Sequence, residues 1–85
     1  MIRNVKVYLY STLGCHLCDK AKEILWPALQ QYQCKLVEID IAEDDKLIER
    51  YGIRIPVLSA ADSPKELNWP FDAEQVEAFL AGISL

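Results

Sequence analysis

Two cysteines three positions apart, Cys15 and Cys18, are the residues of this chain whose types and spacing are best suited to chemistry. They follow the apolar run from Val5 to Tyr10 and open a stretch with the pattern of a helix. A thiol at a helix N-terminus lies near unpaired backbone N–H groups and the positive end of the helix dipole, and both favour the reactive thiolate. The order strand, Cys-x-x-Cys, helix therefore predicts thiol–disulfide chemistry.

The two thiols should have different roles. In thiol–disulfide exchange an attacking thiolate makes a mixed disulfide, which a neighbouring thiol then resolves. Cys15 is nearer the turn, so we expect it to be the more exposed nucleophile and Cys18, one helical turn deeper, to resolve. Protonated His16 would stabilise the Cys15 thiolate, whereas the carboxylate of Asp19 would raise the pKa of a nearby thiol. The sequence leaves open which of these opposing effects prevails.

A metal site is the competing interpretation of the same thiols. Tetrahedral zinc usually takes four ligands, and only Cys34 and His16 remain to complete the set. His16 is too close to its cysteine neighbours to share the ion comfortably, so we expect a redox pair with no metal and no bound cofactor. Cys34 begins the second predicted strand, where a small hydrophobic role is expected.

Periodicity and turn residues predict the elements that position the pair. The pattern predicts strands over 5–10 and 35–40 and a third strand reached through 53–59. A hairpin partner over 65–68 should follow the turn residues Asp62-Ser63-Pro64. Helices are predicted from Cys15 to about Tyr32, over 43–51, and from Asp72 to Gly82. An unbroken βαβ unit is right-handed, so the first two strands should be parallel and the terminal hairpin should complete the sheet. We therefore expect a single α/β domain over 1–85, ordered β-α-β-α-β-β-α, with a four-stranded mixed central sheet flanked by helices.

Several details of these helices can be predicted as well. In the first helix one apolar stripe contains Leu17, Ala21, Ile24, Leu25 and Ala28. Pro27 lacks an N–H and disfavours helix at the preceding residue, so we predict a kink or break there. In the second helix Leu47 and Ile48 should face inward, and Gly52 suits the C-cap. Asp72 and Gln75 have the spacing of a capping box.

Composition and charge exclude several function classes. The net charge is −4 and the nine basic residues are scattered, so neither a nucleic-acid partner nor an anionic membrane surface is expected. No apolar run approaches the roughly 18 residues that cross a bilayer, and the start of the chain lacks the pattern of a signal peptide. We expect a cytoplasmic monomer.

Three segments resemble the small glutaredoxin-like proteins of the thioredoxin superfamily, and together they cover nearly the whole chain in the right order. They are Thr12-Leu13-Gly14-Cys15-His16-Leu17-Cys18, the run from Tyr51 to Leu58 with its Ile-Pro-Val, and Glu66 to Asp72 with its Trp-Pro-Phe-Asp. The resemblance implies a thioredoxin fold, dithiol redox activity in cell redox homeostasis, and a cis Pro56 beside the Cys pair. A cis proline that begins a strand would leave the backbone groups of Ile55 free to hold an extended substrate.

The chain departs from the pattern of ordinary glutaredoxins at two glutathione contacts. Thr12 stands where those proteins carry a lysine, and Asn68-Trp69-Pro70-Phe71 replaces a Gly-Gly pair before the last helix. Asp72 matches the acidic residue that begins that helix. The resemblance thus implies substrate-binding roles for Thr12, Ile55, Pro56 and Asp72. A disulfide-containing protein or a small thiol is the expected substrate, and the use of glutathione as co-substrate stays open. The alternative is a non-catalytic module that binds a protein partner or a metal through the Cys pair.

Overall fold

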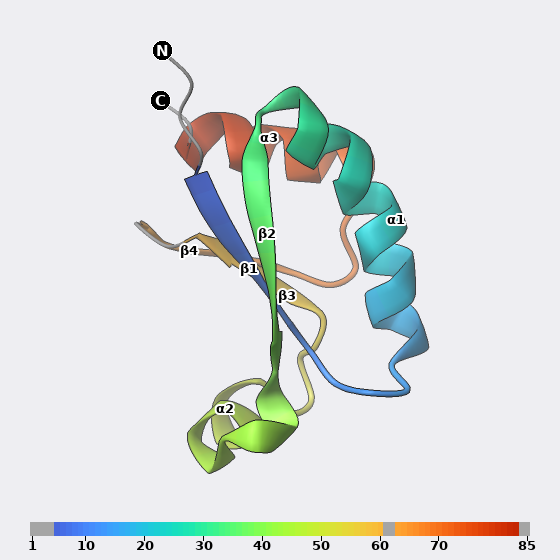
Figure 1. The fold of residues 1–85 in the computed structure, drawn as a ribbon, viewed down its shortest axis with the longest axis vertical. Coiled ribbons are helices and arrows are strands. Elements are labelled where there is room, and N and C mark those ends of the chain that lie inside the picture. The colour runs from blue at the N-terminus through green and yellow to red at the C-terminus, as the bar shows by residue number, and fades with distance from the viewer. Residues whose placement is uncertain (1–4, 61–62, 84–85) are drawn as a thin grey trace.

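The computed structural model describes residues 5–60 and 63–83, which form one four-stranded sheet with helices packed on it (Figure 1). The elements are β1 (Val5–Ser11), α1 (His16–Gln31), β2 (Cys34–Asp40), the 3₁₀ helix η1 (Ile41–Glu43), α2 (Asp45–Tyr51), β3 (Val57–Ala60), β4 (Ser63–Asn68) and α3 (Ala73–Ile83). Apart from η1, this is the predicted order. Asp62, assigned to a turn from its type, lies outside the described residues.

The strands lie in the order β2-β1-β3-β4. β1 pairs with β2 in parallel, whereas β1–β3 and β3–β4 are antiparallel, so the sheet is mixed as predicted. The parallel pair is joined through α1, as a βαβ unit requires. In the part of the chain that the structure describes, no helix is long and apolar enough to cross a membrane.

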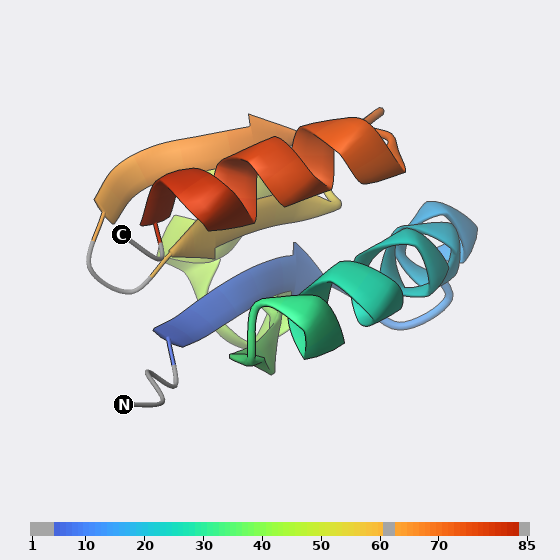
Figure 2. The same ribbon diagram turned by 90° about the horizontal axis from the view of Figure 1, so that it is seen from above.

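Alternation along the strands divides the core between the two faces of the sheet. On one face Val7, Leu9 and Leu58 form a cluster with buried residues of α1 and α3, which pack against each other (Figure 2). On the other face a smaller cluster contains Ile41, Tyr51 and Val57. Because side chains alternate along a strand, neighbours such as Val57 and Leu58 serve opposite faces. The helix that carries the Cys pair therefore rests on the larger core.

A kink or a break was predicted at Pro27; helix α1 runs without interruption from His16 to Gln31, so the break does not occur. Proline inside a helix costs about 3 kcal/mol because it removes one hydrogen bond and crowds the preceding turn. Leu25 and Leu29, on either side of it, are buried in the core, and each such side chain contributes about 1.5–3 kcal/mol. Core packing on both sides of the proline thus outweighs the local preference.

The buried stripe of α1 also differs from the predicted one at its start. Leu17 is 43% exposed, whereas Cys18 is 2% exposed and occupies the inward position. Ala21, Leu25 and Ala28 are buried as predicted, and Ile24 packs partly buried against them. The thiol itself is therefore the first buried residue of the helix.

Helix α2 begins at Asp45, two residues later than predicted, because the side chain of Asp44 caps it and accepts from the Lys46 N–H at 2.9 Å. Leu47 packs against the smaller cluster, but Ile48 is exposed, so its predicted inward orientation is wrong. The helix buries Tyr51, one turn after Leu47, instead.

Gly52 is the C-cap of α2, as predicted, but for a different reason from the usual one. Its backbone is right-handed, at φ −49° and ψ −39°, so no left-handed conformation requires glycine. A Cβ at this position would lie 2.5 Å from the carbonyl oxygen of Ile48. Close approach of backbone to backbone is therefore what requires glycine here.

The predicted capping box of α3 is confirmed. The Gln75 N–H donates to the Asp72 carboxylate at 2.8 Å, and the Asp72 N–H donates to the Gln75 side-chain oxygen at 2.9 Å. The helix continues one residue past Gly82, to Ile83.

Candidate active site

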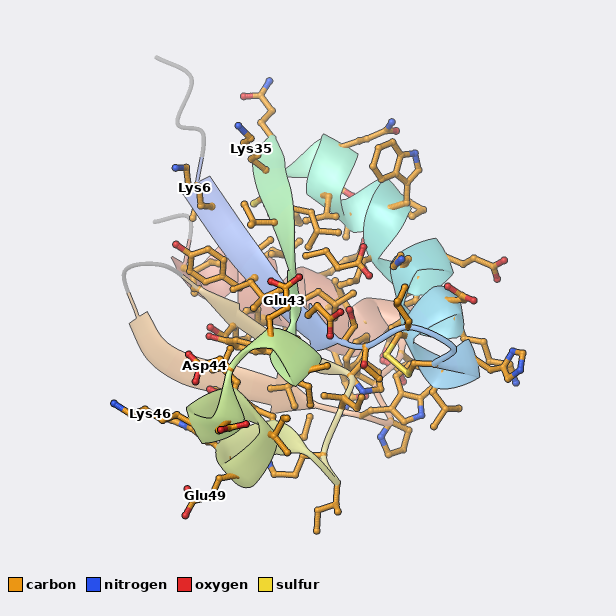
Figure 3. All side chains as sticks on the ribbon, turned by 60° about the horizontal axis from the view of Figure 1, so that its bottom comes forward. Lys6, Lys35, Glu43, Asp44, Lys46 and Glu49 are labelled. Atoms are coloured by element: carbon orange, nitrogen blue, oxygen red, sulfur yellow. A yellow bond between two sulfur atoms is a disulfide. The ribbon has the colours of Figure 1, made fainter. Side chains whose placement is uncertain are left out.

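Cys15 and Cys18 lie where β1 hands over to α1, and they form a disulfide with their Cα atoms 5.2 Å apart (Figure 3). Gly14, at φ +77°, makes the left-handed turn that delivers Cys15 to the helix. Cys15 is the N-cap residue, and its sulfur accepts from the Cys18 N–H at 3.1 Å. A helix N-terminus thus directs a backbone donor at the first sulfur, which is an arrangement that favours a thiolate there.

The two sulfur-bearing residues differ in exposure as predicted. Cys15 is partly exposed, whereas Cys18 is only 2% exposed. An incoming thiol or disulfide can therefore reach Cys15 more readily than Cys18. The geometry permits attack at Cys15 and transfer of the bond to Cys18 one turn deeper.

The neighbouring charged residues are turned toward solvent. His16 is the first residue of α1 and is exposed, and within residues 5–60 and 63–83 it has no hydrogen bond or ion pair. Asp19 pairs with Lys22 at 3.9 Å, which offsets part of its negative charge. The tuning of the Cys15 thiol by His16 stays a prediction.

Strand register brings a second segment to the same end of the sheet. β1 pairs Tyr10 with Val57, and β4 pairs Asn68 with Val57, so Pro56 lies beside the point where β1 leaves the sheet toward Cys15. The Ile55–Pro56 peptide bond is cis, as the family resemblance implied. A second cis bond, Trp69–Pro70, was not predicted. The topology therefore gathers the Cys15 turn, Ile55–Pro56 and Trp69–Pro70 at one sheet end.

The expectation that both backbone groups of Ile55 are free is wrong for its N–H. That N–H donates to the carbonyl oxygen of Tyr51 at 3.2 Å, and the Arg54 N–H donates to the same oxygen at 2.8 Å. The reason is that the chain continues helical hydrogen bonding beyond Gly52 as it leaves α2. Among the described residues, the carbonyl of Ile55 accepts no hydrogen bond.

The remaining candidates occupy the borders of the site. Thr12 is partly exposed in the turn between β1 and Cys15. Asp72 is exposed and caps α3, so one carboxylate oxygen already has a backbone donor. A substrate contact for either residue stays a prediction.

A polar network that the sequence did not reveal ties α1 to the sheet. Glu38 of β2 accepts from the buried hydroxyl of Ser11 at 2.9 Å and pairs with Lys22 of α1 at 2.9 Å. The hydrogen bond from Lys22, aided by that from Ser11, holds the pKa of Glu38 below its ordinary value of 4.5, although burial opposes this. Lys22 follows Cys18 by one helical turn, so these contacts join α1 to β1 and β2 close to the Cys pair.

A second network, centred on Tyr51, was also missed. The Tyr51 hydroxyl donates to Glu66 at 2.5 Å, and its ring stacks on Tyr10 with centroids 4.2 Å apart. Arg54 donates to Glu66 at 3.0 Å and to Asn68 at 2.8 Å. Glu66 lies 15 residues from Tyr51 and 12 from Arg54, so no local spacing in the sequence signals these contacts.

These contacts shift the ionisation of both acids. Burial and the hydrogen bond to Glu66 raise the pKa of Tyr51 well above its ordinary value of 10.0. The hydrogen bond from Tyr51, together with that from Arg54, holds the pKa of Glu66 below its ordinary value of 4.5, against the effect of burial. The pair is therefore a neutral phenol bonded to an ionised carboxylate at neutral pH.

Cys34 lies at the opposite end of α1 from the disulfide. It is partly buried against the larger core, and its thiol is 3.7 Å from the carbonyl oxygen of Tyr32. It lines a cavity of about 340 Å³ beside Trp26, which is 59% exposed. Among the residues that the structure describes, no three His, Cys, Asp or Glu side chains are grouped so that they could hold a metal ion.

Comparison with known proteins yields one family and a set of similar folds. Residues 6–81 match the model of the family described as "Glutaredoxin-like domain (DUF836)". The target protein XcR50 from X. campestris is 39% identical with a TM-score of 0.70, over 89% of this chain and 96% of that one. Protein Ne2328 from Nitrosomonas europaea is 29% identical with a TM-score of 0.78, over 93% and 94% of the two chains.

A more distant likeness concerns the fold alone. A mutant thioredoxin from Halobacterium salinarum is 18% identical, with a TM-score of 0.73 over 98% of this chain and 77% of that one. At this identity the similarity supports a thioredoxin fold and carries no information about substrate.

Proposed function

The chain belongs to the glutaredoxin-like domain family, and from that premise we propose that it is a thiol–disulfide oxidoreductase with Cys15 as nucleophile and Cys18 as resolving thiol. The observation that carries the proposal is the asymmetry of the pair. Cys15 is a partly exposed N-cap residue whose sulfur accepts a backbone N–H, whereas Cys18 is buried within disulfide distance of it.

The proposed reaction transfers two electrons from the dithiol to a substrate disulfide. The Cys15 thiolate attacks one substrate sulfur, so that a mixed disulfide forms, the substrate disulfide breaks, and the departing thiolate takes up a proton. Cys18 then loses its proton and attacks the Cys15 sulfur. The Cys15–Cys18 disulfide forms and the second substrate thiol leaves. An external thiol reductant must reduce the pair again; with an oxidised pair and a dithiol substrate the same steps run in reverse.

Exposed apolar side chains on the segments that lead to Cys15 and to Pro56 support a disulfide-containing polypeptide as substrate. Leu13 is 91% exposed two residues before Cys15, and Ile53 is fully exposed three residues before Pro56. Such apolar side chains can pack on a polypeptide, and the Ile55 carbonyl can pair with its main chain. Thr12 and Asp72 are proposed to contact the substrate at the borders of the site.

Glutathione stays a candidate co-substrate without the lysine and the Gly-Gly pair that ordinary glutaredoxins use. An odd number of cysteines and a lone Cys-x-x-Cys fit a reducing compartment, so we propose a cytoplasmic location. We also propose that the protein works as a monomer.

The deciding experiment is the reduction potential of the pair, measured by mass after equilibration in glutathione redox buffers. A two-electron transition within about −120 to −270 mV is expected for a working oxidoreductase. Cys15→Ser should abolish turnover, whereas Cys18→Ser should accumulate mixed disulfides with substrate. Full turnover by the Cys15→Ser protein would overturn the assignment.

If no intramolecular disulfide forms at any redox potential of the glutathione buffers, the result favours a non-catalytic module. Metal analysis of protein purified under reducing conditions would then separate the two forms of that alternative. Stoichiometric zinc or an iron–sulfur absorption band indicates a metal-binding module, and a metal-free dithiol indicates a protein-binding one.

A further inference from the structure

Three side chains next to the segment that carries Ile55 and Pro56 are joined by hydrogen bonds. They belong to Tyr51, Arg54 and Glu66, and we call them the Glu66 clamp. We propose that the Glu66 clamp is a positioning device that fixes the Ile53–Pro56 segment against the sheet and thereby sets the affinity for an extended disulfide substrate. The inference rests on the proposed function, because it concerns how that substrate is held.

The first step of the argument is the hydrogen bonding of the segment. The N–H groups of Arg54 and Ile55 both donate to the carbonyl oxygen of Tyr51. The place of Ile55 in space is therefore set by the place of Tyr51. Any movement of Tyr51 is transmitted to Ile55 through two backbone hydrogen bonds.

The second step is the fixing of Tyr51 itself. Its side chain is buried, its ring stacks on Tyr10 of β1, and its hydroxyl donates to Glu66 of β4. The guanidinium groups of Arg50 and Arg54 each lie 5.3 Å from the centre of its ring. Tyr51 thus joins the end of α2 to two strands of the sheet.

The third step is a second set of hydrogen bonds that holds the segment, made by the Arg54 side chain. Arg54 lies two residues before Pro56, and its side chain donates to Glu66 and to Asn68, both on β4. Glu66 is the shared acceptor, since one of its oxygens takes the Tyr51 hydroxyl and the other takes Arg54. Its side chain is only 20% exposed, so these charge-assisted bonds are partly shielded from water.

The residues of the Glu66 clamp belong to other elements of the fold than the two cysteines. The disulfide is held by the turn after β1 and by α1, whereas the hydrogen bonds of the clamp join α2, the approach to β3, and β4. The Tyr51 ring stacks on Tyr10 of β1, and Glu66→Gln leaves both rings in place. Loosening the clamp should therefore change how a substrate is held without changing the dithiol itself.

The experiment compares Glu66→Gln with the wild-type protein on two disulfides. For a polypeptide disulfide, kcat/KM should fall about tenfold, within the roughly hundredfold that a 1 Å misplacement can cost. For a small aromatic disulfide, which has no main chain to pair with Ile55, the rate should change less than about twofold. The reduction potential of the Cys15–Cys18 pair should stay the same. Hydrogen exchange at the amides of Arg54 and Ile55 should become faster.

Two further variants separate positioning from loss of stability. Leu36→Ala shortens a partly buried side chain of β2, at the far edge of the sheet from β4, and weakens the fold without touching the segment, so it should leave the polypeptide kcat/KM within about twofold. Arg54→Met should lower the polypeptide kcat/KM in the same way, and the double variant should lose less than the two single variants combined, because both changes remove the Arg54–Glu66 contact.

Each outcome is decisive. Equal loss on both disulfides, or an equal loss in Leu36→Ala, overturns the positioning role. Unchanged exchange at Arg54 and Ile55 in Glu66→Gln overturns the clamp itself. A wild-type protein with no turnover on any disulfide overturns the proposed function instead, and the exchange measurement then decides the clamp independently.

Discussion

Replacing Gly52 by alanine should destabilise the protein, although the backbone there has right-handed helical angles. At such angles the exchange ordinarily stabilises by about 0.4–1 kcal/mol, because alanine restricts the unfolded chain. Here the added Cβ would lie 2.5 Å from the Ile48 carbonyl oxygen, about 0.9 Å inside the 3.4 Å at which ordinary contact begins. That oxygen also accepts the Gly52 N–H at 2.8 Å, so it cannot withdraw without losing the bond.

The net effect follows from these two opposing contributions. Overpacking of this kind costs about 1–3 kcal/mol. Subtracting the middle of the ordinary gain from the middle of this cost leaves a loss of about 1.3 kcal/mol in the free energy of unfolding, a large share of the roughly 5–15 kcal/mol typical of a small domain. Because Gly52 leads directly into the Ile53–Pro56 segment, relief of the clash should also displace Ile55 and lower kcat/KM for a polypeptide disulfide.

Urea denaturation at constant m-value measures this loss, and the other two glycines of the chain provide matched controls. Gly82→Ala lies within α3 with nothing nearer to its Cβ than the Lys65 ammonium at 4.0 Å, so it should stabilise by about 0.4–1 kcal/mol. Gly14→Ala enters open space but at φ +77°, so it should cost about 1–2 kcal/mol. A Gly52→Ala protein as stable as the wild type, or more stable, would refute the steric reasoning.

Three further predictions test the site and its supports. Asp72→Ala should lower the free energy of unfolding by about 1 kcal/mol in urea titrations, because α3 loses its N-cap; an unchanged value would contradict the capping role. Glu38 and Glu66 have lowered pKa values in the fold, so the stability that they contribute is present above their ordinary value of 4.5 and is lost as the pH falls below it. Thermal melts should show this decline, and Gln at both positions should flatten it; an equally steep decline in that variant would sink the explanation. Alkylation rates of the two single-Ser variants should differ, after the background from Cys34 is subtracted. Cys15 in a Cys18→Ser protein should react at least about tenfold faster than Cys18 in a Cys15→Ser protein, because Cys18 is 2% exposed. Equal rates would rule out the assigned roles.

Local patterns accounted for most of the fold because their physical causes are local. The capping box of Asp72 and Gln75 needs only three residues of helical spacing, and the alternation of β1 needs only the pleat of one strand. Of the kink or break predicted at Pro27, the break does not occur, because burial of Leu25 and Leu29 against other elements outweighs the local preference. A local pattern is thus reliable where no distant packing opposes it.

The sequence by itself determined where the two thiols lie: a Cys-x-x-Cys at the strand-to-helix turn places one thiol at a helix N-terminus and the other one turn inside. The family resemblance added Ile55 and Pro56 to the site, and strand register placed them at its end of the sheet.

Only the tertiary structure decided how the site is built. It turned Leu17 outward, against the predicted apolar stripe, because the rotation of α1 on the sheet selects which residues are buried. It also engaged the Ile55 N–H with Tyr51 and joined Tyr51 to Glu66 across the sheet. These contacts depend on how the chain leaves α2 and on the register of β4, which the packing of distant segments fixes and no local spacing encodes.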